Sequence, residues 1–506
     1  MMRNPVRLAM LALAILSLSG AAAGAAEDKA TASPYEAKSW SKELRGTFNG
    51  KRIDYVATAS ETVMKDADGK EKAAIFSISY VAKDRDATRP VTFLFNGGPG
   101  SASLWLHMGA FGPKRVAIPS DARDDGAPPY PILDNPLSIL DVTDLVFIDP
   151  VGTGFSKALG GTDPKEFYGI GEDARSVGDF IRRWLNANGR WNSPKFIGGE
   201  SYGTTRTAAV VNELEGRYND VSFNGLLLIS TILDFSAEAP EPGNEMSPVL
   251  YLPTMAATAW YHDRVPGKPA IEGFLEEARA FASGPYLAAL MKGNRLGAEE
   301  RAAVRARLAY FTGLSETYLE QADLRVAPQR FMKELLRDRG VTVGRLDSRY
   351  TGVDYDAAGE RPDNDPSFYA IDGAYTAAVN SWLRDELGVD FDRPYSVIGG
   401  LGGRWNWQLE DRFRGAYLNV APYIGRALRE NSGLRVFNAA GWFDFATPFY
   451  GAEYSLSRTG IPDGRITFRY YPAGHMMYVH EPSLEALTRD VRSFIVTRQD
   501  AFSTGN

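Results

Sequence analysis

A serine between two glycines is the first feature of this chain that could do chemistry. The segment Gly199–Gly203 reads Gly-Glu-Ser-Tyr-Gly and directly follows the short apolar stretch 195–198. Such a segment at the end of a strand is typical of a nucleophile elbow, a turn so tight that the serine hydroxyl projects above the sheet. A serine hydroxyl is a weak nucleophile unless a base accepts its proton. We therefore expect Ser201 to be catalytic only if the chain also supplies a histidine and an acid.

Histidine is scarce, which narrows the search for the base. The four histidines are His107, His262, His475 and His480. In hydrolases with a nucleophile elbow, the acid and then the histidine follow the serine, each on a loop after a later strand. His107 precedes the serine, and His262 comes too early to leave room for the remaining strands. We expect His475 to be the base because it lies in the loop that leaves the expected strand 466–471, with His480 as the alternative.

The expected acid is Asp444, in the loop 440–444 that leaves the expected strand 434–438. Alone, a Gly-x-Ser-x-Gly segment is more often a plain turn than a catalytic one. A histidine in a glycine-rich loop is likewise more often a surface residue. Ser201, Asp444 and His475 follow one another in the order that a catalytic triad of this architecture requires, each at a strand exit. The joint arrangement favours a triad.

A second glycine-rich loop, Asn96–Gly100, follows the expected buried strand 91–95. Acyl transfer builds negative charge on a carbonyl oxygen, which preorganised N–H groups stabilise. We expect the backbone amides of Gly98 and of Tyr202, the residue after the nucleophile, to form this oxyanion hole. The alternatives are a plain turn and a phosphate-binding loop. The latter is disfavoured because no Gly-x-Gly-x-x-Gly or Gly-Lys-Ser/Thr pattern follows.

Four blocks of sequence together resemble the serine carboxypeptidases, peptidase family S10. They are Asn96–Ser101, Asp149–Ser156, Gly199–Gly203 and the late Asp444 with Gly474-His475. The blocks stand in the family's order and span about residues 91–482. The resemblance implies an α/β-hydrolase fold and a serine carboxypeptidase activity on peptides with a free C-terminus. It also implies that Asn96, Gly97 and Glu200 hold the terminal carboxylate of the substrate.

A glutamic acid can hold a carboxylate only if the two groups share a proton, since two like charges at hydrogen-bond distance repel. We therefore expect cleavage to be favoured at acidic pH, where Glu200 is protonated. The alternative role for Glu200 is to cap nearby backbone. The chain departs from the family at Leu94, Thr204, Met477 and Tyr478, and it has no cysteines for the usual disulfides. These departures remove no reacting group, but they bear on the shape of the substrate pocket.

Two other functions remain open for the same residues. The fold and triad could serve an esterase, an amidase or an acyltransferase. The chain could also be a non-catalytic binding protein that retains the fold. The complete set Ser201, Asp444 and His475 argues against the second of these.

The elements that must position these residues alternate along the chain. Residues 44–81 alternate as strands do, with a hairpin turn at 66–70. Further expected strands at 91–95, 145–148, 195–198 and 225–229 alternate with helices such as 171–188. This alternation predicts an α/β fold: a mainly parallel sheet with helices on both faces and the active loops at the carboxyl ends of the strands.

An insertion is expected to divide the hydrolase core. The first part of the core covers residues 27–232 and the second part covers 402–506. Residues 233–401 show helical periodicity at 271–291, 298–310, 315–337 and 367–387. We expect this insertion to form a helical cap over the active site that limits access to chain ends. The alternative is a scaffold insertion with no role in selectivity.

The N-terminal residues 1–26 are expected to form a signal peptide. Arg3 and Arg7 supply positive charge, residues 8–18 form an apolar core, and small residues at 20–26 offer a cleavage site before Glu27. The apolar core is shorter than the ~20 residues that span a bilayer. We expect an exported bacterial protein, periplasmic or secreted, without stable membrane insertion. A permanent N-terminal anchor is the alternative.

Composition excludes other classes of function. A net charge of −7 with no basic stripe argues against nucleic acid as a partner. At 506 residues the chain can bury a large core without disulfides. The histidines lack metal-ligand spacing, and Asp66–Gly69 lacks the later glutamate of a calcium loop. We therefore expect catalysis without metal or cofactor.

Overall fold

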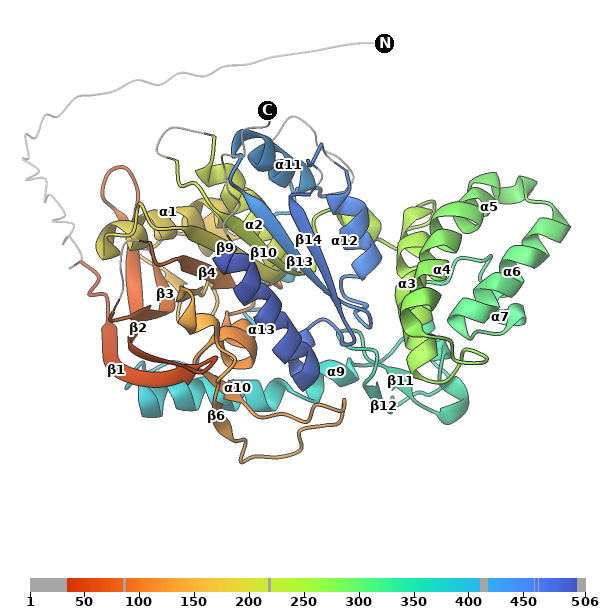
Figure 1. Cartoon of the computed structure of the whole chain (residues 1–506), viewed down its shortest axis with the longest axis horizontal. Helices are drawn as coiled ribbons and strands as arrows, with labels where there is room; N and C mark the ends of the chain where they lie inside the picture. Colours follow the sequence, from red (N-terminus) through yellow and green to blue (C-terminus); the bar gives the residue numbers. More distant parts are fainter. Residues whose placement is uncertain are drawn as a thin grey trace, which may run out of the picture. The chain divides into compact units, whose positions relative to one another are not determined.

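A ten-stranded mixed sheet forms the centre of the fold (Figure 1). The computed structural model describes residues 34–84, 88–216, 220–409, 417–458, 460–462 and 464–497. Nine strands follow one another in the order β1-β2-β3-β7-β4-β9-β10-β13-β14, and β8 pairs with β3. Their bounds are β1 Ser39–Phe48, β2 Lys51–Lys65, β3 Glu71–Ala82, β4 Val91–Phe95, β7 Asp144–Ile148, β8 Lys157–Ala158, β9 Lys195–Ser201, β10 Gly225–Thr231, β13 Arg435–Gly441 and β14 Ile466–Tyr471.

The sheet begins with the antiparallel strands β1, β2 and β3, as the alternation at 44–81 predicted. The turn between β2 and β3 is closed by the side chain of Asp66, whose Oδ1 accepts the amides of Asp68 and Lys70. An aspartate at the start of a turn commonly makes these local bonds. The predicted hairpin is therefore confirmed.

The other half of the sheet is parallel, from β7 through β4, β9, β10 and β13 to β14. The predicted mainly parallel sheet is confirmed. In β10, Leu226 and Leu228 enter one hydrophobic cluster, while Leu227 and Ile229 enter another on the opposite face. Strands covered on both faces read as continuous apolar runs, which is why these segments lack polar alternation. Their carboxyl ends meet at one edge, so the loops that follow them can share a site.

Helices cover both faces of this parallel half. The cluster on one face includes residues of α1 (Ile170–Asn188), α2 (Tyr202–Leu214) and α11 (Ala421–Glu430). The cluster on the other face includes residues of α10 (Asp372–Ser381) and α13 (Glu481–Val496). The α/β class predicted from the sequence follows from this layering.

Most remaining helices lie between β10 and β13 in sequence. They are α3 Met246–Tyr261, α4 Ile271–Phe281, α5 Leu287–Lys292, α6 Ala298–Thr312, α7 Glu316–Gln321, α8 Pro328–Glu334 and α9 Pro366–Tyr369, together with the short strands β11 Thr342–Val343 and β12 Thr351–Gly352. Figure 1 shows α3 to α7 as one green group near α12 (Phe449–Leu456). A third hydrophobic cluster joins this group to Phe443 and Phe445, on either side of Asp444. The domain boundaries expected from the sequence stay a prediction.

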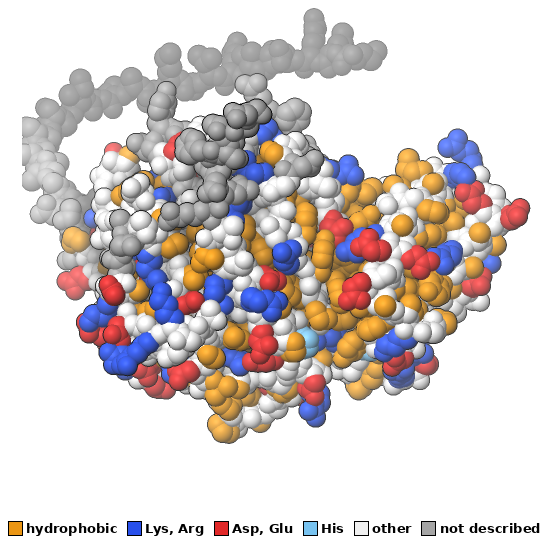
Figure 2. All heavy atoms as spheres, in the orientation of Figure 1, with side chains coloured by type: hydrophobic (Ala, Val, Ile, Leu, Met, Phe, Trp, Pro, Cys, Tyr) orange, Lys and Arg blue, Asp and Glu red, His pale blue; other side chains and the backbone are white. Residues whose placement is uncertain are grey.

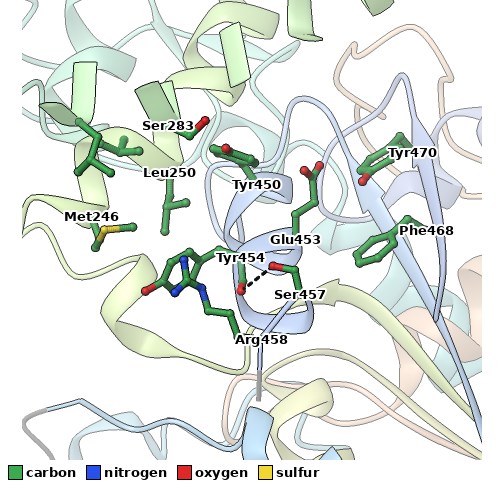
Figure 3. Close-up of a pocket in the computed structure, with 12 residues that line it drawn as sticks. Met246, Leu250, Ser283, Tyr450, Glu453, Tyr454, Ser457, Arg458, Phe468 and Tyr470 are labelled. Carbon is green, nitrogen blue, oxygen red and sulfur yellow. Dashed lines mark hydrogen bonds between the residues drawn. The ribbon is translucent and has the colours of Figure 1, made fainter. Parts of the chain in front are cut away.

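A salt bridge and a cavity mark the seam between this helical group and the core. Arg279 of α4 contacts Glu453 of α12 at 2.8 Å, and its guanidinium lies 5.2 Å from the ring centre of Tyr470. A cavity of about 470 Å³ opens beside them, with Met246 and Leu250 on one wall (Figure 3). The helical group is therefore held to the core by both charge and apolar contact.

The predicted signal peptide, residues 1–26, lies outside the described residues. Among the residues that are described, no helix is both long and apolar enough to span a bilayer. On the face seen in Figure 2, basic and acidic side chains are interspersed, and Lys and Arg do not gather into a stripe.

Candidate active site

Ser201 lies at a strained turn between β9 and α2. Its backbone has φ 61° and ψ −131°, and a positive φ is uncommon for a residue with a side chain. The flanking glycines make the turn possible, because a Cβ on Gly199 would collide with the backbone of Gly203. The Ser201 side chain is half-buried. The turn therefore has the geometry of the predicted nucleophile elbow.

Asp444 and His475 meet at the ends of β13 and β14. His475 Nδ1 lies 2.8 Å from Asp444 Oδ2, and both side chains are buried. Burial lowers the pKa of His475, but the attraction and hydrogen bond of Asp444 outweigh it, so the pKa stands above its ordinary value of 6.5. An acid in this position holds the imidazole in one tautomer and stabilises its protonated form. Asp444 and His475, which were expected from the sequence to act together, are thus in direct contact.

Thr447 is a further partner that the sequence did not indicate. Its hydroxyl donates to Asp444 Oδ2 at 2.7 Å and lies 3.2 Å from His475 Nδ1. The amides of Ala446 and Thr447 donate to Asp444 Oδ1 at 2.7 and 3.0 Å. Both carboxylate oxygens of Asp444 are therefore occupied, which fixes the carboxylate relative to the imidazole.

The described residues include no hydrogen bond between Ser201 and His475. Hydrogen bonds of this kind are often long before substrate binds and tighten in the complex. The charge of His475 lowers the pKa of Glu200, so the imidazole acts on the residue directly before the nucleophile. Ser201, Asp444 and His475 stand at or after the carboxyl ends of β9, β13 and β14, which lie at one edge of the sheet.

The other histidines have different partners. His480 Nδ1 lies 2.8 Å from Ser483 Oγ at the start of α13, so Asp444 is not its partner. His107 is buried 2.6 Å from the Tyr80 hydroxyl, and burial lowers its pKa to about 3. His262 Nε2 lies 2.7 Å from the Ser348 carbonyl. Of the four, His475 has the acid partner that a general base requires.

The glycine-rich loop after β4 packs directly against the elbow. A Cβ on Gly97 would lie 2.6 Å from the Tyr202 nitrogen and 2.6 Å from the Glu200 carbonyl oxygen. Gly98 has φ +105°, a conformation that favours glycine. Tyr202 is the first residue of α2, where backbone amides have no partner within the helix. The two amides predicted for the oxyanion hole belong to segments in close contact.

Glu200 and Asn96 form a buried pair beside Ser201. Asn96 Nδ2 donates to Glu200 Oε1 at 3.1 Å, and the Leu106 amide donates to Asn96 Oδ1 at 3.0 Å. Glu200 Oε2 and the Tyr478 hydroxyl are buried and have no hydrogen-bond partner among the described residues. Buried polar atoms without a partner are rare and call for an explanation. These two atoms could bind a polar group of a ligand.

Burial raises the pKa of Glu200 to about 7, although His475, Tyr478 and Asn96 each lower it. The Tyr478 hydroxyl is close enough to act on this pKa but makes no regular hydrogen bond to Glu200. Near neutral pH a large share of Glu200 is therefore protonated. A protonated carboxyl can donate a hydrogen bond to a carboxylate, which is the role expected for Glu200 from the sequence.

A buried ion pair between Arg206 and Asp173 holds the backbone of Asn96 in place. Arg206 Nη1 donates to the Asn96 carbonyl at 2.6 Å, and Arg206 Nε contacts Asp173 Oδ2 at 2.6 Å. Arg206 is among the largest fully buried side chains described. Charged residues are rarely buried unless paired, so a sequence alone gives little reason to place Arg206 and Asp173 there.

Residues 345–348, in the connection between β11 and β12, contact both the acid loop and the histidine loop. Its carbonyls accept the amides of His475 at 2.6 Å, from Leu346, and of Phe445 at 3.0 Å, from Arg345. We call residues 345–348 the brace segment.

The Asp347 side chain ties the brace segment to the histidine loop. Its Oδ2 accepts the amide of Gly474 at 3.1 Å, and Arg349 contacts the same carboxylate at 2.6 Å. Both side chains are buried. The sequence does not indicate this contribution, because the segment lies far along the chain from both loops and carries no recognisable motif.

Within the described part of the chain, no group of three or more His, Cys, Asp or Glu side chains is arranged to hold a metal ion.

Sequence comparison gives matches to one family. The family model for serine carboxypeptidase matches residues 55–249. Serine carboxypeptidase-like 34 of Arabidopsis thaliana is 27% identical over 169 residues, which are 32% of this chain and 32% of that protein. Serine carboxypeptidase-like 45 of the same plant is 28% identical over 182 residues, 34% of this chain and 36% of that protein. The matches thus span about a third of the length of these relatives.

Structural comparison extends the likeness to most of the chain. The crystal structure of KEX1(DELTA)P, a prohormone-processing carboxypeptidase from Saccharomyces cerevisiae, matches with a TM-score of 0.52 and 16% identity. The match covers 87% of this chain and 91% of that one. At this identity the likeness establishes the fold alone. The chain therefore has the α/β-hydrolase fold, and over residues 55–249 its sequence is similar to the serine carboxypeptidases.

Proposed function

We propose that this protein is a serine carboxypeptidase that removes amino acids one at a time from the C-terminus of peptides. The observation that carries the proposal is the buried Glu200, with one oxygen unpartnered, directly before Ser201. An esterase or amidase has no need of a protonated acid at this position. A substrate with a terminal carboxylate does need one.

In the proposed reaction, Ser201 attacks the carbonyl carbon of the last peptide bond and His475 accepts its proton. Asp444 fixes the imidazole tautomer and stabilises the imidazolium. The amides of Gly98 and Tyr202 donate to the oxyanion. His475 then gives its proton to the leaving amino group, and the terminal amino acid departs.

The second half of the reaction releases the shortened peptide. A water molecule takes the place of the departed amino acid, gives a proton to His475 and attacks the acyl-enzyme ester. The ester bond to Ser201 Oγ breaks, and the serine recovers its proton from the imidazolium. The residues of this chain suffice for both steps.

Substrate recognition in this proposal rests on Asn96, Gly97 and Glu200. The protonated Glu200 donates to one oxygen of the terminal carboxylate, and the Asn96 side chain and Gly97 backbone complete the contact. The pKa of about 7 supports a site that accepts a carboxylate below neutral pH and repels it above. Activity on peptides is therefore expected to favour the acidic side of neutrality.

The test compares two peptides that differ only at the C-terminus, one with a free acid and one with an amide. We expect kcat/KM to be at least tenfold higher for the free acid below pH 6, with single residues released in order from the C-terminus. The Ser201→Ala variant is the control, and it should lose several orders of magnitude in rate. Equal rates on the two peptides would instead indicate an esterase or amidase. Failure of a fluorophosphonate to label Ser201 would indicate a non-catalytic protein.

We further propose that the chain is exported, on the strength of the charged, apolar and small-residue pattern of residues 1–26. Expression of the full chain in a bacterium, followed by N-terminal sequencing of the periplasmic and membrane fractions, tests this. A soluble product that begins near Glu27 is expected. An uncut chain in the membrane fraction would contradict it.

A further inference from the structure

A polar cavity of about 260 Å³ lies beside the acid loop. Phe445 and Ala446, which directly follow Asp444, form one wall. Its charged lining residues are Arg330, Arg345, Arg361 and Glu238. These come from four separate segments, so the cavity is formed where the insertion meets the core.

The charge of this cavity is predominantly positive. Arg330 contacts Glu360 at 2.8 Å, which offsets its charge. Arg345 and Arg361 are exposed, and their guanidinium groups have no hydrogen bond or ion pair among the described residues. Two unpaired guanidinium groups in one hollow are suited to bind carboxylates, which they can contact through two parallel hydrogen bonds.

Glu238 is the one carboxyl group among the residues that line the cavity. Burial raises its pKa well above the ordinary value, although Arg345 lowers it in part. Even when it is ionised, this single carboxylate is outnumbered by the two unpaired guanidinium groups of Arg345 and Arg361. The two arginines remain available to an acidic ligand.

The order of the strands places this cavity relative to the nucleophile. Strands β4, β9, β10 and β13 lie side by side in that order. Asn96 follows β4 and Ser201 ends β9, whereas Glu238 follows β10 and Phe445 follows β13. Neighbouring strands are about 4.8 Å apart. The loops that carry Glu238 and Phe445 thus leave the sheet on the opposite side of Ser201 from Asn96, from strands that are one and two spacings away from β9.

Charge effects on pKa values also indicate that the cavity lies near the proposed triad. The charge of Arg345 lowers the pKa of His475, although the pKa of that histidine is raised overall. Asp444 raises the pKa of Glu238. The cavity and the proposed triad are thus within range of each other's charges.

We infer that this cavity binds acidic side chains of the substrate, two or three residues before the scissile bond, through Arg345 and Arg361. The inference rests on the proposed function, which places the terminal carboxylate at Asn96 and Glu200. The rest of the peptide must then run from Ser201 toward β10 and β13. An extended peptide advances about 3.3 Å per residue, so the second or third residue before the bond reaches the cavity.

The larger cavity in Figure 3 does not offer this chemistry. Its one lining arginine, Arg458, lies 3.8 Å from the ring centre of Tyr454, and its carboxylate, Glu453, is bound by Arg279 at 2.8 Å. Its lining residues come from the helical group, α12 and β14, and none belongs to the loops that carry Ser201, Asp444 or His475. The arginine cavity is therefore the better candidate for a substrate subsite.

The test measures binding by calorimetry, using the full chain with Ser201→Ala so that no turnover occurs. Two blocked peptides with a free C-terminus carry either Glu or Lys at the second and third positions before the last bond. We expect the Glu peptide to bind about fivefold more tightly at low salt, as one or two partly exposed ion pairs provide. The difference should shrink in 0.5 M salt, because salt screens exposed charges.

The variant Arg345→Gln/Arg361→Gln, made in the same Ser201→Ala chain, should bring the two affinities within about twofold. Both side chains are exposed, so the variant should fold, and its melting temperature checks this. Arg295→Gln, an exposed arginine in the connection between α5 and α6, is the matched control and should keep the preference. Equal affinities before mutation, no binding of either peptide, or a preference that survives the double substitution would overturn the inference.

The binding assay separates this inference from the proposed function. A protein that prefers the Glu peptide, while the enzyme with Ser201 intact fails to shorten it, would keep a site for acidic side chains at this cavity and refute the carboxypeptidase proposal. An enzyme that shortens both peptides at equal rates and binds them equally would do the reverse.

Discussion

Replacing Glu200 with glutamine removes one titrating proton from the proposed carboxylate site and changes its shape little. Glutamine can still donate to a substrate carboxylate, and it can still accept the bond from Asn96, which is 3.1 Å long. What it cannot do is ionise. Any difference between Glu200→Gln and the unmodified enzyme in pH dependence therefore reports the charge of Glu200.

The pKa of about 7 sets the expected profile. Above that value Glu200 loses its proton and repels the terminal carboxylate, so kcat/KM on a free-acid peptide should fall about tenfold per pH unit. Between pH 7 and pH 9 the loss should reach about 50-fold, because about half of Glu200 is protonated at pH 7 and about one part in a hundred at pH 9. The Gln variant should lack this decline. Both enzymes should still lose activity at low pH, because His475 must be unprotonated to act as a base.

Stability gives a second and independent measure of the same group. The pKa of Glu200 is raised from 4.5 in the ordinary state to about 7 in the folded chain. A raised carboxyl pKa means that the folded state holds its proton more tightly than the unfolded chain does. Its contribution is therefore fully present below pH 4.5 and is lost as pH rises through 7, by about 3 kcal/mol in all.

The assay is a pair of measurements at several pH values: kcat/KM on free-acid and amide peptides, and urea unfolding of each protein. Glu200→Gln should retain more of its stability from pH 5 to pH 8.5 than the unmodified chain does. On the amide peptide the two enzymes should show the same alkaline profile, since no carboxylate is repelled. Identical alkaline declines of the two proteins on the free-acid peptide would refute the role given to Glu200.

Three further substitutions test residues that hold the proposed catalytic residues in position. Gly199→Ala should destabilise the chain by at least about 2 kcal/mol, because its Cβ would collide with the backbone of Gly203; Gly284→Ala, which has open space around it, should stay within about 1 kcal/mol in thermal unfolding. Thr447→Val removes a 2.7 Å bond to a charged acceptor and should lower kcat about tenfold with KM unchanged, measured by steady-state kinetics. Asp347→Asn leaves the buried Arg349 without its charge partner and should cost about 3 kcal/mol in urea unfolding; an unchanged midpoint would show that the pair carries no stability.

Much of the site could be predicted from the sequence because its chemistry is local. Glycines mark both the turn at Gly199–Gly203 and the loop after β4, because two backbone segments approach each other closely there and leave no room for a side chain. The strands that carry Asp444 and His475 are short apolar runs that end in glycine-rich loops. The histidine was identifiable because only four exist and chain order removes two. Fold class followed from the alternation of such strands with helices.

The features of the site that could not be predicted from the sequence depend on contacts that form only in the folded chain. Thr447 is three residues from Asp444, yet its bond to Oδ2 depends on the path of the loop, which no motif specifies. The buried pair of Arg206 and Asp173 runs against the tendency of charged residues to stay at the surface. The charged residues of the arginine cavity come from four segments that are adjacent only after folding. Sequence patterns report periodicity and turn chemistry, and they carry no information about such convergence.

The brace segment helps to hold the two loops that carry Asp444 and His475 in position. A lid that merely covered the site could be opened or shortened without disturbing the proposed triad. Here residues 345–348 make backbone bonds to both the acid loop and the histidine loop, including one of 2.6 Å to the amide of His475. Hydrogen bonds of this kind are each worth about 1 kcal/mol, and reacting groups must be held to within about 0.5 Å. Because the brace segment also supplies Arg345 to the arginine cavity, one short segment both holds the histidine loop and contributes to the proposed substrate subsite.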